Sequence, residues 1–219
     1  TKSQLNVLNE IKSDLSNPEP MSRLLQGDVG SGKTIIAISS LLIAIEKNLQ
    51  GAFMVPTEVL AEQHFKNLLK YLNPLYVSVE LLTGNTSQKM RKEILSNLKN
   101  GLVDIIVGTH ALFEDKVIFN SLGMVVIDEQ HRFGVTQRNR LLNKGENTNL
   151  LAMTATPIPR TLALSIYGDL DVSQITELPP GRVPITTKII SEDDLNNLFK
   201  IVEDEINKGR QAYVILPLI

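Results

Sequence analysis

The chain has 219 residues, of which 42% are hydrophobic and 21% charged, and it contains no cysteine. These values are typical of a globular protein with a sizeable core, and they exclude disulfides and thiolate metal sites within this sequence. No apolar run is long enough to cross a bilayer, so no membrane role is expected, and the lack of cysteine suits a cytoplasmic location. The formal net charge of −2 provides no overall field that attracts nucleic acid, so such binding would need a local patch.

Along most of the chain, short apolar runs alternate with longer amphipathic stretches, which is the pattern of βα units around a parallel sheet. An amphipathic segment at 4–15 comes first. Buried strands are expected at 23–26, 52–55, 78–82, 104–108, 124–128 and 150–155. Helices are expected at 33–47, 58–71 and 87–100. The predicted fold is therefore an α/β parallel sheet with helices on both faces, and ligands should bind where its strands end.

The stretch ELPPGRVPI, residues 177–185, interrupts regular structure with its prolines and glycine and predicts a linker. Beyond it we expect a strand at 186–190, a helix from the capping residue Ser191 to about Lys208, and a strand at 211–219. One βαβ unit is too small to be a domain. We therefore expect residues 1–180 to form a first lobe, and residues 181–219 to be a linker and the first βαβ unit of a truncated second lobe.

Both ends of the sequence favour a piece of a longer protein, because it begins without Met and stops within the apolar run AYVILPLI. A last strand without its neighbours would leave unpaired backbone groups at an edge. We therefore expect the chain to self-associate through this strand.

The stretch QGDVGSGKT, residues 26–34, matches the phosphate-binding pattern G-x-x-x-x-G-K-[ST] between an expected strand and an expected helix. Glycine allows positive φ and close approach of the backbone, so that several N–H groups can converge on phosphate oxygens. Lys33 would reach the β and γ phosphates, and the Thr34 hydroxyl would bind Mg²⁺. The candidate nucleotide-binding residues of this loop are Gly27, Asp28, Val29, Gly30, Ser31, Gly32, Lys33 and Thr34.

Asp128 and Glu129 directly follow the apolar run MVVI. A carboxylate at the end of a buried strand can bind Mg²⁺ beside a P-loop, and its neighbour can orient the attacking water. We therefore predict Asp128 as a metal ligand and Glu129 as the catalytic base of nucleoside triphosphate hydrolysis. A GTPase is an alternative because NKGE at 143–146 is similar to a guanine-binding element, although it follows the helix-like RNRLL and is better explained as a helix end and turn.

Five segments resemble, in order, the motifs of superfamily 2 helicases: GDVGSGKT, VPTEVLAEQH, GTHAL, DEQHRFGV and MTATPIPRTLA. DEQH, YGDLDVS and LPPGR resemble the RecG family of bacterial ATP-dependent DNA helicases more than its relatives. The resemblance implies a RecA-like lobe that uses ATP and Mg²⁺ and acts on branched DNA such as forks and junctions. Related superfamily 2 translocases, such as transcription-repair coupling factors, remain an alternative, as do a small-molecule kinase and a silent nucleotide-binding scaffold.

The resemblance also implies residue roles. Gln4 corresponds to the glutamine that recognises adenine. Pro56, Thr57, Thr109 and His110 correspond to DNA-backbone contacts. His131, Thr154, Ala155 and Thr156 correspond to residues that couple the γ-phosphate site to DNA. No Q-x-x-G-R-x-x-R stretch is present in the sequence, so the arginine fingers that the family supplies from its second lobe are not part of this chain.

Overall fold

The computed structural model describes residues 1–156, 170–177, 185–187, 189–191 and 194–215. The chain divides into two compact units, Thr1–Pro180 and Gly181–Ile219. The helices of the first unit are α1 (Lys2–Asp14), α2 (Lys33–Glu46), α3 (Glu58–Leu72), α4 (Gln88–Lys99) and α5 (Val135–Leu142), with the short 3₁₀ helices η1 (Asn73–Leu75), η2 (His110–Phe113) and η3 (Gln130–Arg132). Its strands are β1 (Ser22–Gly27), β2 (Gln50–Met54), β3 (Val79–Leu82), β4 (Ile105–Gly108), β5 (Leu122–Ile127), β6 (Asn149–Thr154) and β7 (Asp171–Ile175).

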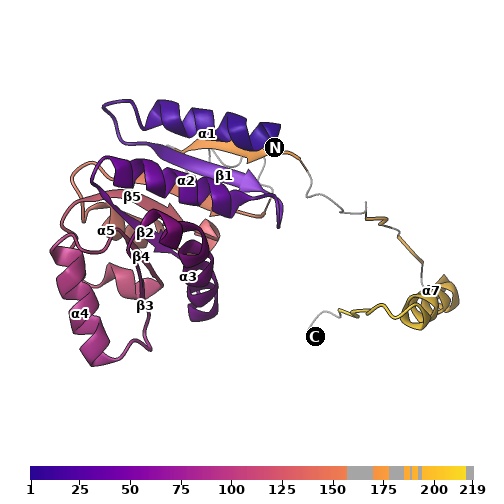
Figure 1. Cartoon of the computed structure of the whole chain (residues 1–219). Coiled ribbons are helices and arrows are strands. Elements are labelled where there is room, and N and C mark those ends of the chain that lie inside the picture. The colour runs from indigo at the N-terminus through magenta and orange to yellow at the C-terminus, as the bar shows by residue number, and fades with distance from the viewer. Residues whose placement is uncertain (157–169, 178–184, 188, 192–193, 216–219) are drawn as a thin grey trace. The chain divides into compact units, whose positions relative to one another are not determined.

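The seven strands form one sheet in the order β3-β4-β2-β5-β6-β1-β7, and every pair is parallel (Figure 1). Gln26 at the end of β1 pairs with Thr154 at the end of β6. Ile127 at the end of β5 pairs with Met54 of β2. Because of this register, the segments that follow these strands all leave the sheet at the same edge.

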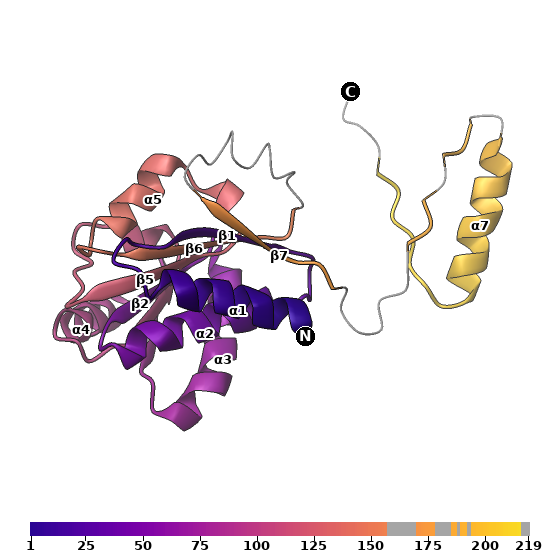
Figure 2. The same ribbon diagram turned by 90° about the horizontal axis from the view of Figure 1, so that it is seen from above.

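Helices cover both faces of the sheet, and neighbouring strand residues point to opposite faces. Leu25 and Phe53 belong to a core shared with α1, α2 and α3, whereas Leu24 and Met54 belong to a second core shared with α4, η2 and α5. Figure 2 shows α1, α2 and α3 on one side of the sheet and α5 on the other. Since strands buried on both faces need apolar side chains throughout, the continuous apolar runs of the sequence are explained.

The predicted α/β architecture is confirmed for the first unit. The strands and helices expected between residues 23 and 155 are present, with bounds that differ by a few residues. The segment NKGE also has the expected form, since α5 ends at Leu142 and a turn follows at 143–147. The strand β7 was not predicted, because its sequence DVSQI is short and contains three polar residues. This composition suits an edge strand, and β7 is the outermost strand beside β1.

The second unit differs from the expectation. Its helix α7 (Leu195–Asn207) has Asp194, not Ser191, at its N-cap. The described residues at 185–187, 189–190 and 211–215 form no strand, so the strand predictions at 186–190 and 211–219 are wrong for them; Lys188 and residues 216–219 lie outside the described residues. A strand is stabilised by pairing with a neighbour, which an apolar composition alone does not supply. The expected self-association rested on the second of these strands.

A buried glutamine stabilises the edge of the sheet where the strands begin. Gln50, at the start of β2, is 5% exposed. Its Nε2 donates to the carbonyl oxygens of Leu98 and Val103 at 2.9 and 2.7 Å. Its Oε1 accepts from the backbone N–H groups of Asn120 and Ser121 at 2.7 and 2.9 Å. One side chain thus satisfies backbone groups from the end of α4 and from the segments that precede β4 and β5.

Replacing this glutamine should test how much the network stabilises the unit. We expect Gln50→Leu to lower the free energy of unfolding by roughly 3 kcal/mol, because buried backbone groups lose their partners. Urea denaturation followed by circular dichroism measures the change. Gln63→Leu, on the exposed side of α3, is the matched control and should change stability by less than about 0.5 kcal/mol. Equal effects of the two variants would contradict the role given to Gln50.

Candidate nucleotide and DNA sites

The P-loop connects the end of β1 to the start of α2, at the edge where the strands end. Gly30 and Gly32 have φ values of 79° and 94°, and Gly32 is the N-cap of α2. At Gly27, an added Cβ would lie 2.6 Å from Ser31 Oγ. The loop therefore requires glycine for backbone conformation at 30 and 32 and for space at 27, and its N–H groups lie at a helix N-terminus, which favours anions.

Lys33 folds back over this loop. Its Nζ donates to the carbonyl oxygens of Gly27 at 2.6 Å and Asp28 at 2.9 Å. Burial lowers the pKa of the Lys33 ammonium from its usual value, and the nearby carboxylates of Asp128, Glu129 and Asp28 oppose this shift. The ammonium and the two predicted catalytic carboxylates are therefore close enough to interact, as a site for a charged phosphate and its metal requires.

Gln4 contacts the same loop from the first turn of α1. Its Nε2 donates to the carbonyl oxygen of Ser31 at 2.8 Å. The contact is tight, since a Cβ added to Gly32 would lie 2.2 Å from Gln4 Nε2. A neighbouring contact also fixes this part of α1. Ser3 Oγ donates to Glu177 Oε2 at 2.8 Å, and Glu177 lies just beyond β7, the strand beside β1. The residue predicted to recognise adenine is thus placed against the P-loop.

Asp128 and Glu129 follow β5, which is separated from β1 only by β6. Neighbouring strands lie about 4.8 Å apart, so the two segments leave the sheet about 10 Å from each other. The Asp128 N–H donates to the carbonyl oxygen of Met54 at 2.9 Å and extends the pairing of β5 with β2. Glu129 has a φ of 50°, an uncommon left-handed conformation, which turns the chain sharply after the strand. Both carboxylates are partly buried, with side chains 14% and 30% exposed.

Asp128 has a partner that sequence analysis missed. His64 Nε2 lies 3.1 Å from Asp128 Oδ2, and the imidazole ring lies against Phe53, with ring centroids 4.7 Å apart. His64 is on α3, in the segment VPTEVLAEQH, where only the residues next to the strand were given a role. A single histidine within a helix carries no spacing signal, so the pattern of the sequence alone did not indicate this contact.

The four predicted DNA contacts follow two neighbouring strands, β2 and β4. Pro56 is partly buried, and Thr57 is exposed and caps α3, accepting from the Leu60 N–H at 3.3 Å. His110 is exposed, whereas Thr109 is only 1% exposed. The structure therefore brings the four residues together, but the buried Thr109 hydroxyl is not placed to contact a phosphate.

The four predicted coupling residues follow β5 and β6, on the nucleotide side of the strand order. His131 Nδ1 lies 3.4 Å from Glu129 Oε2. Thr154, at the end of β6, is 2% exposed, and its Oγ1 accepts from the Thr156 N–H at 3.1 Å. This turn, which includes Ala155, thus lies between the P-loop and the Asp128 segment; the rest of the motif, residues 157–163, is outside the described residues.

The donor set suits a magnesium ion that also contacts phosphates. Mg²⁺ usually takes one or two protein oxygens and fills its remaining positions with water and phosphate oxygens. Asp128 and the Thr34 hydroxyl are oxygens of this kind. Within the described ranges, no three His, Cys, Asp or Glu side chains converge to hold a metal by themselves.

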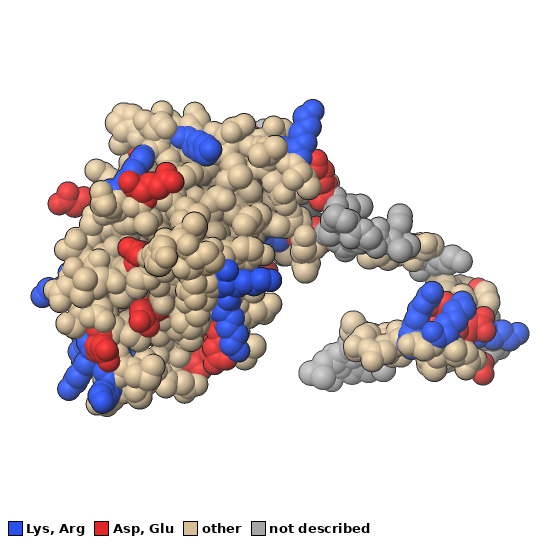
Figure 3. Space-filling view, in the orientation of Figure 1, with Lys and Arg blue, Asp and Glu red and all other residues tan. Residues whose placement is uncertain are grey.

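The surface charge on the face shown in Figure 3 is mixed, with basic and acidic side chains interspersed among neutral ones. This view shows no extended basic patch. Of the helices described, none combines the length and apolar character that a membrane crossing requires.

The profile of the DEAD/DEAH box helicase family matches residues 1–164 of the chain. The chain belongs to this family. It is 53% identical over 219 residues to the ATP-dependent DNA helicase RecG of Synechocystis sp., a match that covers all of this chain and 26% of that protein. It is also 53% identical to the ATP-dependent DNA helicase RecG of Bacillus subtilis, covering 32% of that protein. The chain thus spans less than a third of the length of these relatives.

Solved structures of helicases also resemble this chain. The structure of RecG bound to a three-way DNA junction matches with a TM-score of 0.84 and 44% identity, covering 100% of this chain and 29% of that one. The helicase domain of Pyrococcus furiosus Hef matches with a TM-score of 0.59 and 20% identity, covering 78% and 36% respectively, which shows the shared fold alone. The predicted RecA-like fold and the resemblance to RecG are confirmed.

The contact between Gln4 and the P-loop can be tested by removing the space at Gly32. We expect Gly32→Ala to lower the free energy of unfolding by about 2 kcal/mol, because the backbone is left-handed there and the new methyl group meets Gln4. Thermal denaturation measures the loss. In the Gln4→Ala background the loss should be smaller, since only the backbone strain remains. Strictly additive losses would show that Gln4 does not pack on Gly32 in solution.

Proposed function

We propose that the chain is the nucleotide-binding lobe of an ATP-dependent DNA helicase similar to RecG, which remodels branched DNA such as forks and junctions. The observation that carries this proposal is the meeting of the P-loop with Asp128 and Glu129 at one edge of the sheet, in a chain similar to RecG over its whole length. Residues 1–180 would form the first lobe, and residues 181–219 the linker and the start of the second. A cytoplasmic location follows from a chromosomal substrate.

The residues of the site would divide the work of ATP binding. The loop N–H groups from Gly27 to Thr34 surround the phosphates, and Lys33 exchanges its bonds to the Gly27 and Asp28 carbonyl oxygens for bonds to phosphate oxygens. Gln4, already bonded to Ser31, contacts the adenine. Asp128 and Thr34 would hold Mg²⁺, which neutralises phosphate charge when it is bound.

Glu129 is the proposed base that orients and deprotonates the attacking water. Its carboxylate lies 3.4 Å from Nδ1 of His131, a proposed coupling residue, so a displacement of His131 would alter the position of the carboxylate. Hydrolysis also needs positive charge at the γ-phosphate. In such enzymes an arginine finger supplies this charge and raises the rate of hydrolysis by about 10³- to 10⁵-fold. The sequence lacks the family's arginine-finger motif, so turnover would need a longer protein that contains both lobes.

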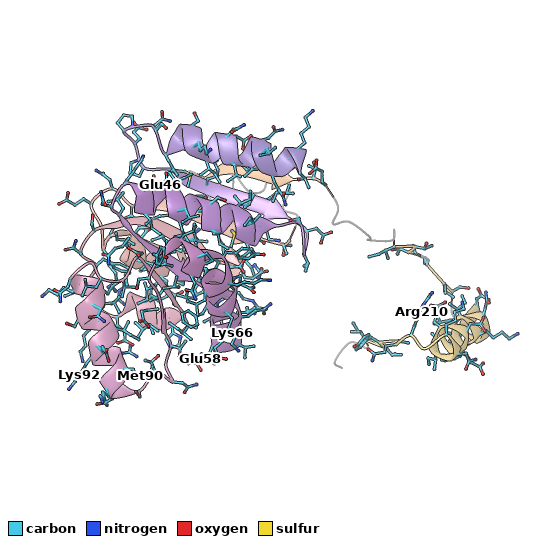
Figure 4. The ribbon with its side chains drawn as sticks, in the orientation of Figure 1. Glu46, Glu58, Lys66, Met90, Lys92 and Arg210 are labelled. Atoms are coloured by element: carbon cyan, nitrogen blue, oxygen red, sulfur yellow. The ribbon has the colours of Figure 1, made fainter. Side chains whose placement is uncertain are left out.

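Nucleotide binding by the 219-residue chain tests the proposal. We expect calorimetric titration with ADP and Mg²⁺ to show binding that Lys33→Ala weakens roughly 10- to 100-fold, through loss of charge-assisted hydrogen bonds. Lys66→Ala, an exposed lysine on α3 (Figure 4), is the matched control and should bind normally. Binding that persists in Lys33→Ala would contradict the proposed site.

Measurements of ATP hydrolysis test the catalytic roles of the site separately from nucleotide binding. We expect the 219-residue chain to hydrolyse ATP only in trace amounts, roughly 10³ to 10⁵ times more slowly than a longer protein with both lobes and branched DNA. In that longer protein, Glu129→Gln should retain ATP binding and lower kcat by roughly 10² to 10⁴. Rapid turnover by the 219-residue chain would show that the site is completed within it.

The DNA site is proposed at the ends of β2 and β4. Backbone N–H groups and short polar side chains in such positions suit phosphate contacts that carry no sequence information. Thr57 is exposed, and its hydroxyl hydrogen is free to be donated while Oγ1 accepts from Leu60. His110 is also exposed. Of the adjacent pair, we therefore assign the side-chain contact to His110 and a backbone contact to Thr109.

The adjacent residues 109 and 110 allow a paired test in the longer protein. We expect His110→Ala to weaken DNA-stimulated hydrolysis to a similar degree on unrelated DNA sequences, with unchanged affinity for ATP. Thr109→Val should have little effect, because it removes a buried hydroxyl while keeping the shape of the side chain. Loss of DNA stimulation in Thr109→Val but not in His110→Ala would reverse the assignment.

A further inference from the structure

The carboxylate of Asp128 is held from both sides by donors of this chain. Its Oδ1 accepts from the Glu129 N–H at 3.0 Å. Its Oδ2 lies 3.1 Å from His64 Nε2. Because an ionised carboxylate only accepts hydrogen bonds, Nε2 must carry the hydrogen. The two bonds fix the plane of the carboxylate and leave its remaining lone pairs for another ligand.

His64 is itself held rigidly. It is 8% exposed, its ring lies 4.7 Å from that of Phe53, and its buried Nδ1 has no hydrogen-bond partner in the part of the chain that is described. Helix α3 is fixed at its start by the Thr57 cap. Glu58 (Figure 4) also accepts from the backbone N–H and the side-chain Nδ2 of Asn85, beyond β3.

The buried polar edge of His64 is not explained by packing alone. An apolar side chain would fill the same space beside Phe53 without burying an unpaired nitrogen, which carries a free-energy cost. The Nε2 hydrogen bond to Asp128 is the one hydrogen bond that the described residues give to this ring. The chemistry of the contact thus points to the carboxylate, not to the core.

We propose that His64 is a positioning residue for Asp128, which holds the carboxylate in the orientation that binds Mg²⁺ with the nucleotide. The proposal deepens the proposed function and rests on it. His64 acts through Asp128 and does not contact the metal or ATP. Residues that orient a metal ligand in this way change metal affinity when replaced, since a freely rotating carboxylate loses part of its binding geometry.

The test measures the coupling between Mg²⁺ and nucleotide in the 219-residue chain. The affinity for ADP is determined by calorimetry in excess Mg²⁺ and in EDTA, and their ratio reports how strongly the metal and nucleotide support each other. We expect His64→Leu to reduce this ratio roughly 10-fold, while the affinity in EDTA stays the same. His64→Gln, whose amide can place a donor near the position of Nε2, should restore most of the ratio.

Two controls distinguish positioning from packing. Phe65→Leu alters the next, partly buried side chain of α3 and should leave the ratio unchanged. In the Asp128→Asn background, His64→Leu should cause no further loss, because its effect passes through the carboxylate. A further loss of the ratio in the Asp128→Asn background would overturn the proposal. Losses in Phe65→Leu and His64→Gln as large as that in His64→Leu would also overturn it, because they would indicate a general role of α3 packing.

A spectroscopic measurement needs no nucleotide. In a long-range ¹H–¹⁵N spectrum of the chain, His64 should carry its hydrogen on Nε2; a hydrogen on Nδ1 alone would exclude the bond to Asp128 and overturn the proposal.

The binding experiments also distinguish failure of the proposed nucleotide site from failure of the proposed role of His64. If Lys33→Ala abolishes ADP binding but His64→Leu keeps the full Mg²⁺ ratio, the nucleotide site stands and the role of His64 fails. If Lys33→Ala binds normally, the nucleotide site fails and this inference fails with it.

Discussion

Parallel pairing of all seven strands brings the carboxyl ends of the strands to a single edge of the sheet, and both candidate sites lie there. Strand order then separates them. The P-loop, the Thr154 turn and Asp128 follow β1, β6 and β5, whereas the DNA candidates follow β2 and β4. The two groups meet where β2 pairs with β5, and there the Asp128 N–H donates to the Met54 carbonyl oxygen. The sheet therefore both separates the two sites and connects them through one pair of strands.

Helix α3 provides a second connection between these sites. Its N-cap is Thr57, a proposed DNA contact, and two turns later, about 10 Å along the helix axis, His64 contacts Asp128. The helix contains neither proline nor glycine, which are common causes of a sharp kink. Displacement of its first turn would alter the contact of His64 with the Asp128 carboxylate, so α3 connects the segment proposed to contact DNA with the segment proposed to bind Mg²⁺.

Most of the first unit could be predicted because its strands are buried on both faces and its helices are amphipathic, so that each type has its own apolar pattern. The P-loop was also predictable, since its glycine spacing is dictated by backbone geometry. The strand β7 and the contact of His64 were not, because each depends on a neighbour that is distant in sequence: β7 on β1, and His64 on Asp128. The burial of Thr109 likewise depends on packing. The described residues at 186–187, 189–190 and 211–215 form no strand, which shows that a strand-like composition alone does not make one.

The contact between Ser3 and Glu177 brings α1 of the first unit beside β7, the last strand among its described residues. Figure 1 shows the N-terminus next to the end of β7. Domains whose two ends lie close together tolerate circular permutation and insertion into other proteins. A short linker could therefore join residue 177 to residue 1, and new termini could be opened at a surface turn far from the site, such as 143–147. Because its two ends are close together, this unit can be inserted into a longer chain without a long connecting segment across its surface.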